Sequence, residues 1–343
     1  MKISKSAVFL TALILLTSSV SCSSSKETEL SETGLFAMDT YMTLKANGKN
    51  ADSALKKAEN RIRELESELS VTDENSDIAK LNQLGGQGAT VSDDAAALIS
   101  AGIEYGKLTS GALDITVYPV LAEWGFTTGE YHIPDKSKLD ELLEYVDYSR
   151  IEVDGSNVTL PEKSMIDLGA LAKGYTGDEI IKILRENGAD SAVISLGGNV
   201  QTLGSKPDGS DWRIGVKDPF SPDRDFCVLS VCNKAVVTSG NYERCFTGDD
   251  GKVYWHIIDP VDGRPADNGL VSVTIIAESG LMCDALSTSL FIMGTDKAVD
   301  YWKMHGDFDM ILVTDDSSVL YTEGLSDSFE NTGGMPAEVI SND

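Results

Sequence analysis

The chain has 343 residues and a formal net charge of −27 at pH 7, from 55 acidic and 28 basic side chains. That length is enough for one large domain or two modest ones, with a sizeable hydrophobic core. So negative a chain is a poor candidate for binding nucleic acid or an anionic membrane through a basic surface. A phosphate-bearing substrate would need a cation or local backbone donors at its site.

The first 22 residues have the pattern of a secretion signal. A basic start is followed by an apolar run over 7–16 that is too short to span a membrane. Cys22 then precedes three serines, as in a bacterial lipoprotein signal whose cysteine becomes the lipidated first residue. We expect an exported protein on the extracytoplasmic face of a membrane, held by a lipid anchor only, with a tether at 23–34. An ordinary cleaved signal with a spare cysteine is the alternative.

A folded domain is expected over 35–325, followed by a C-terminal tail at 326–343. Helical periodicity in the first half of this domain predicts four helices. They cover 50–69, 92–108, 135–146 and about 171–187. A β-hairpin is expected at 151–160, because Asp154-Gly155-Ser156-Asn157 is a turn sequence between two short β-prone runs.

The second half of the domain is richer in β-strands. Short apolar or alternating runs predict strands at 192–196, 212–216, 226–231, 235–238, 254–258, 271–277 and 310–314, with a helix at about 281–293. Strands this close together favour a largely antiparallel mixed sheet with packed helices, an α+β fold. A Rossmann domain is not expected, because the chain has no strand–GxGxxG–helix unit.

The remaining cysteines give no sign of a zinc or iron–sulfur site. Cys227, Cys232, Cys245 and Cys283 form no CxxC pair, and the chain has only three histidines. All four cysteines stand in apolar contexts, so we expect buried free thiols.

The segment 283–288 has a candidate metal-binding face. On a helix, the spacing of Asp284, Ser287 and Thr288 brings their side chains together. A carboxylate and two hydroxyls are hard oxygen ligands, which suit Mg2+. The alternative is an ordinary helix N-terminal cap, a common use of Asp and Thr.

Three other segments have ambiguous patterns. Residues 166–175 form a glycine-bracketed helix start, either a ligand-binding loop or a plain strand-to-helix turn. The Gly197-Gly198 loop is an equally weak signal, and 241–244 could line a pocket or form a solvated turn. His256 lies on the run 254–258, where it is either a structural histidine or a catalytic base.

Five motifs occur in an order that resembles the ApbE family of FAD:protein FMN transferases. They are 167–175, 195–199, 238–244, 256–260 and 284–288, and the resemblance runs from about Phe36 to about Gly324. It implies that a Thr or Ser hydroxyl of a target protein attacks the FMN phosphorus of FAD in the presence of Mg2+. AMP leaves, and FMN remains on the target as a phosphoester.

The resemblance also implies roles for individual residues. His256 matches the histidine that serves the acceptor hydroxyl. The positions that match contacts to FAD are Met38, Ala112, Leu113, Asp114, Asp167, Lys173 and Ile258. The positions that match the Mg2+ site are Ala170, through its backbone carbonyl, with Asp284, Ser287 and Thr288.

The chain departs from the family pattern at two positions. Asp39 stands where glycine is usual, which affects the shape of that loop, and Thr72 stands where the family has an aromatic residue. The implied partners are exported or membrane redox subunits that carry an acceptor Thr or Ser. Two other functions stay open: an Mg2+-dependent FAD pyrophosphatase giving FMN and AMP, and a non-enzymatic FAD-binding lipoprotein.

Overall fold

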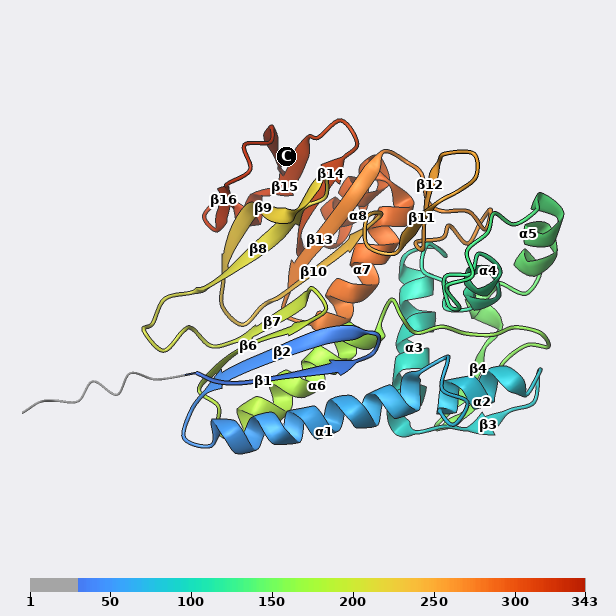
Figure 1. Cartoon of the computed structure of the whole chain (residues 1–343), viewed down its shortest axis with the longest axis horizontal. Coiled ribbons are helices and arrows are strands. Elements are labelled where there is room, and N and C mark those ends of the chain that lie inside the picture. The colour runs from blue at the N-terminus through green and yellow to red at the C-terminus, as the bar shows by residue number, and fades with distance from the viewer. Residues whose placement is uncertain (1–29, 343) are drawn as a thin grey trace, which may run out of the picture.

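The computed structural model describes residues 30–342, and a nine-stranded sheet forms its centre (Figure 1). Its strands, in order across the sheet, are β1 (Ser31–Ala37), β2 (Thr40–Asn47), β6 (Ser191–Leu196), β7 (Asn199–Leu203), β10 (Ala235–Gly240), β13 (Leu270–Ala277), β14 (Asp309–Thr314), β15 (Val319–Thr322) and β17 (Ala337–Ile340). Every neighbouring pair is antiparallel except β15 with β17.

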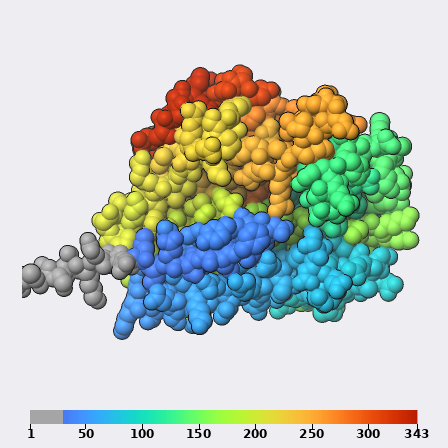
Figure 2. Space-filling model, in the orientation of Figure 1, coloured from blue at the N-terminus to red at the C-terminus, as the bar shows by residue number. Residues whose placement is uncertain are grey.

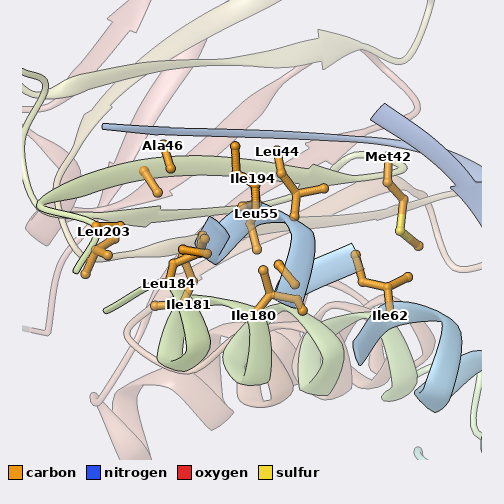
Figure 3. Close-up of a cluster of buried hydrophobic side chains, with 14 of the residues drawn as sticks. Met42, Leu44, Ala46, Leu55, Ile62, Ile180, Ile181, Leu184, Ile194 and Leu203 are labelled. Carbon is orange, nitrogen blue, oxygen red and sulfur yellow. The ribbon is translucent and has the colours of Figure 1, made fainter. Parts of the chain in front are cut away.

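Helices α1 (Ala51–Leu69) and α6 (Ala172–Glu186) cover β1, β2 and β6 on one face of this sheet. Figure 3 shows their side chains meeting those of the strands in one apolar cluster. In α1, Leu55 and Ile62 are fully or almost fully buried, and they lie on one side of the helix because of their spacing. They face Leu44 and Ile194, so the hydrophobic periodicity of the sequence decides which way this helix packs.

The other half of the sheet is covered on both faces. Helices α7 (Gly280–Met293) and α8 (Thr295–His305) pack on β10, β13 and β14. On the opposite face lies a second antiparallel sheet, ordered β16 (Phe329–Asn331), β9 (Ser221–Val231) and β8 (Trp212–Asp218). All eight residues of β13 are buried as a result, which matches its almost unbroken apolar sequence.

Of the remaining elements, η2 packs near β14, and the others lie beside the end of α1 and beyond it (Figure 1). The remaining elements are α2 (Asp77–Gln83), β3 (Ala89–Thr90), α3 (Asp93–Leu108), α4 (Tyr118–Glu123), α5 (Lys136–Leu143), η1 (Tyr148–Arg150), β4 (Glu152–Asp154), β5 (Asn157–Thr159), β11 (Cys245–Thr247), β12 (Val253–Trp255) and η2 (Glu323–Leu325). This region brings residues 112–127 against the turn that follows β12.

The expected α+β fold, with its largely antiparallel sheet, is confirmed. Three boundaries differ from expectation. β1 begins at Ser31, inside the segment expected to be tether, and β16 and β17 lie in the expected C-terminal tail. The strand expected at 254–258 ends at Trp255, because the chain turns there and Ile258 makes a bridge with Pro265 instead.

The signal pattern and Cys22 lie outside the described residues. Within 30–342, no helix combines the length and the apolar character needed to cross a bilayer. Cys227 and Cys283 are buried as expected, Cys232 and Cys245 are half-buried, and all four are free thiols.

Candidate active site

A cavity of about 830 Å³ lies at one end of the central sheet, a size typical of cofactor sites. The β1–β2 turn, the start of α6, α7 and the turn after β12 form its walls. Figure 2 shows the N-terminal strands (blue), the residues near 110–140 (green) and the C-terminal half (orange) meeting in this part of the molecule. The sequence-predicted residues that line the cavity are Met38, Ala112, Leu113, Asp114, Asp167, Ala170, Lys173, His256, Ile258, Asp284 and Thr288.

Two tight turns lie side by side at the cavity, because β2 pairs with β6. The first joins β1 to β2 through Met38 and Asp39, whose φ angles are 48° and 58°. Such a turn needs left-handed backbone at both central residues, and Asp tolerates it better than most side chains. The departure at Asp39 therefore leaves the turn intact. The second turn uses Gly197 and Gly198 in the same backbone region.

The N-termini of α6 and α7 cross in close contact at two glycines. A Cβ on Gly174 would lie 2.7 Å from the Asp284 Cβ, and a Cβ on Gly280 would lie 2.7 Å from the Gly174 carbonyl oxygen. Each helix also supplies an aspartate to the N-terminus of the other. Asp178 accepts hydrogen bonds from the Gly280 amide at 2.6 Å and the Leu281 amide at 3.0 Å.

The other half of this exchange involves Asp284. Its Oδ2 accepts the Gly174 amide at 2.8 Å. Gly174 lies in the first turn of α6, where a backbone amide has no carbonyl partner inside the helix, so Asp284 caps this helix end. Ala170 lies just before the helix and lines the cavity.

Asp284 and Thr288 face the cavity together, whereas Ser287 does not. Ser287 is fully buried, and its hydroxyl contacts the Ser239 hydroxyl at 2.9 Å and donates to the Asp284 carbonyl at 3.0 Å. The Ser239 hydroxyl also contacts the Thr288 hydroxyl, at 3.2 Å, and the expected role of Ser287 in metal binding stays a prediction. Within residues 30–342, no group of three or more His, Cys, Asp or Glu side chains could hold a metal.

Burial raises the pKa of four carboxyl groups on the cavity wall, those of Asp114, Asp167, Glu243 and Asp284. At Asp284 this effect of burial exceeds the opposing effects of the Lys173 charge and the Gly174 amide. A cation in the cavity would stabilise these groups as carboxylates. Asp114 also accepts hydrogen bonds from the Thr116 amide at 2.8 Å and the Tyr148 amide at 3.1 Å, so its side chain fixes the loop.

His256 lies just beyond β12, and its amide donates to the Arg244 carbonyl at 3.0 Å. Its Nδ1 is buried and has no hydrogen-bond partner within residues 30–342. The ring meets Phe126 edge-on, with 6.4 Å between centroids. Burial, together with the positive charges of Arg244 and Lys173, lowers the pKa of His256 to about 4. The imidazole is therefore neutral at pH 7.

Asn199 and Ser239 also line the cavity, and sequence reasoning gave neither of them a site role. Arg244 lines it too, and it belongs to the segment 241–244, for which a pocket wall and a solvated turn were the two alternatives. Asn199 directly follows the Gly-Gly turn, and Ser239 and Arg244 flank the end of β10. The feature of the sequence that could have identified them is their position beside a turn at the end of a strand, because such loops often carry binding residues. Thr72 also lines the cavity, so that stretch of wall has a small polar side chain.

Comparisons with known proteins agree on one family. The ApbE family model matches residues 38–312. A protein of Treponema pallidum named FAD:protein FMN transferase is 31% identical over 293 residues, which cover 80% of this chain and 81% of that one. A protein of the same name from Klebsiella pneumoniae is 33% identical over 264 residues, covering 76% and 81%.

Solved structures give the same result. The ApbE protein from Thermotoga maritima superposes with a TM-score of 0.81 at 32% identity, covering 86% of this chain and 98% of that one. The apo flavinyl transferase ApbE of Pseudomonas stutzeri has a TM-score of 0.78 at 25% identity, covering 89% and 98%. The matched region contains every described site residue named above. The chain therefore belongs to the ApbE family.

Proposed function

We propose that this protein is an FAD:protein FMN transferase that uses Mg2+ and modifies Thr or Ser hydroxyls of target proteins. The observation that carries the proposal is one cavity whose wall gathers the neutral His256, the buried Asp284 carboxyl group and the Thr288 hydroxyl. The names of the relatives, which match most of the chain, support the same reaction.

The residues present suit Mg2+ better than a softer metal. Asp284 supplies one carboxylate, Thr288 a hydroxyl and Ala170 a carbonyl, all of them hard oxygen ligands. Mg2+ is commonly held by one or two carboxylates with substrate phosphates completing its shell. When bound, it would offset the charge of the pyrophosphate and of the departing AMP.

His256 is placed to serve the acceptor hydroxyl. As the hydroxyl oxygen bonds to the FMN phosphorus, the bond from that phosphorus to the bridging oxygen breaks. AMP leaves with the bridging oxygen, and the hydroxyl proton passes to the neutral imidazole. Phosphates near Arg244 and Lys173 would offset the charges that lower the His256 pKa, so the bound substrate makes the imidazole a stronger base.

The test is incubation of the purified protein with FAD and Mg2+, with and without a threonine-bearing acceptor protein. We expect a fluorescent acceptor in the gel and a matching amount of AMP, both dependent on Mg2+. His256→Ala should abolish transfer and spare FAD binding, and Asp284→Ala should remove the response to Mg2+. Steady AMP release without acceptor would instead indicate a pyrophosphatase, and bound FAD with no AMP a carrier.

We also propose export and membrane anchoring through Cys22, with exported or membrane redox subunits as targets. Support comes from the signal pattern of the sequence and from Cys22 at its end. Labelled fatty acid should enter the wild-type protein and not Cys22→Ser, which should be released from the membrane fraction. Equal labelling of both would contradict the anchor.

A further inference from the structure

Asn199 is the first residue of β7 and lines the cavity directly after the Gly197-Gly198 turn. Its side chain is 2% exposed. Neither its Oδ1 nor its Nδ2 has a hydrogen-bond partner within residues 30–342. A buried carboxamide with both ends unpaired is costly and rare in native proteins, so it requires an explanation.

Among the described side chains that line the cavity, one other carries such an unpaired buried atom, and it is His256. Under the proposed function, the His256 imidazole binds the acceptor hydroxyl. Because the Asn199 amide is also buried and unpaired, we expect it to bind part of a ligand as well. Its neighbour is Asp284, and an interaction between the two side chains favours the ionised form of that carboxyl group, although the Asn199 amide has no hydrogen bond of good geometry.

The position next to Asp284 indicates which part of FAD Asn199 meets. A cation held by Asp284 and Thr288 must lie against the pyrophosphate whose charge it offsets. In a chain of net charge −27, that pyrophosphate needs local donors, and an amide NH2 supplies them without adding charge. We infer that Asn199 donates a hydrogen bond from Nδ2 to a pyrophosphate oxygen of FAD. This inference rests on the proposed function.

The backbone holds Asn199 in place before any ligand arrives. Asn199 pairs with Leu196 across the tight turn, and β7 is hydrogen-bonded on its other edge to β10. A Cβ on Gly197 would lie 2.7 Å from the Thr40 Cγ2, so the turn packs closely on the start of β2. A donor fixed in this way loses little conformational freedom when it binds.

The experiment is equilibrium FAD binding to the full chain, followed by flavin fluorescence with Mg2+ present and with EDTA. AMP is assayed in the same samples to correct for turnover. The variants are Asn199→Ala, which removes the amide, and the near-isosteric Asn199→Asp, which keeps an oxygen and loses the donor. Ser272→Ala is the matched control, because it removes another unpaired buried polar atom from the same sheet away from the cavity.

We expect both Asn199 variants to bind FAD about 10- to 100-fold more weakly, since each loses a hydrogen bond to a charged group. Ser272→Ala should bind as wild type does. Wild-type affinity in Asn199→Ala would overturn the inference, as would unchanged or tighter Mg2+-dependent binding in Asn199→Asp, which would make residue 199 a cation ligand instead. Wild-type protein that neither binds FAD nor releases AMP would overturn the proposed function itself.

Discussion

At the scale of single residues, the charge state of His256 makes a pH prediction. Its folded pKa of about 4 lies below the usual 6.5, so the imidazole stays neutral and able to accept a proton down to about pH 5. The transfer rate kcat/KM should stay level from pH 8 to about pH 5.5 and fall only toward pH 4. Initial rates with a fluorescent readout of the acceptor check this, and an acidic limb centred near pH 6.5 would contradict it.

Asp39 gives a stability prediction at the same scale. Its φ of 58° strains any L-residue, and glycine adopts this conformation freely. Asp39→Gly should raise the free energy of unfolding by about 1 kcal/mol, measured as a higher urea midpoint. Asp39→Val should lower the midpoint, because a β-branched side chain tolerates this backbone least. A stabilising valine would show that the turn opens in solution.

Sequence reasoning found the site residues unevenly, and the reason is physical. The resemblance to the family identified Asp284 and His256, because both residues lie within short motifs that can be read directly from the sequence. Helical spacing placed Ser287 and Thr288 on one face, but it could not show that Ser239 of β10 contacts both hydroxyls. Sequence reasoning gave Asn199 no role, since an unpaired buried amide is a property of packing and leaves no mark in the sequence.

At the scale of elements, the contact between α6 and α7 predicts that Asp178 matters for stability and for the site. Asp178→Ala removes the acceptor of two amides at the start of α7, which should lower the free energy of unfolding by about 1–3 kcal/mol. The shift of α7 should also weaken the response of activity to Mg2+, because Asp284 lies on that helix. Denaturant unfolding and a Mg2+ titration measure the two effects.

The control for Asp178 is Asp52, an exposed aspartate in the first turn of α1. Asp52→Asn should change the free energy of unfolding by less than about 0.5 kcal/mol. If the two variants lowered the free energy of unfolding by the same small amount, the hydrogen bonds of Asp178 to the start of α7 would contribute no more than an exposed aspartate at an ordinary helix end.

Elements with a strong local pattern were predicted well. The helices at 50–69 and 92–108 and the hairpin at 151–160 each match to within a residue or two, because periodicity and turn chemistry act locally. The ends of the domain were missed. β16 and β17 are short strands at the edges of their sheets, and their pairing with β9 and β15 makes them strands.

At the scale of the whole molecule, the net charge of −27 predicts a response to salt. Self-repulsion destabilises the compact state, and dissolved ions screen it. The melting temperature should therefore rise by a few degrees between 20 and 300 mM NaCl, measured by calorimetry without Mg2+. A falling melting temperature would mean that attractive ion pairs, such as Arg61 with Asp94, outweigh the repulsion.

The cavity takes its walls from Met38 near one end of the fold to Ile292 near the other. No short stretch of chain contains it, so a molecule must bring β1, β2, β7, β10 and α7 together before it can bind the flavin. Folding and FAD binding are therefore thermodynamically linked. Each tenfold increase in FAD concentration above the dissociation constant should raise the free energy of unfolding by about 1.4 kcal/mol. If the chain folds after export, as proposed above, the supply of FAD outside the cytoplasm would help to decide how much folded enzyme survives there.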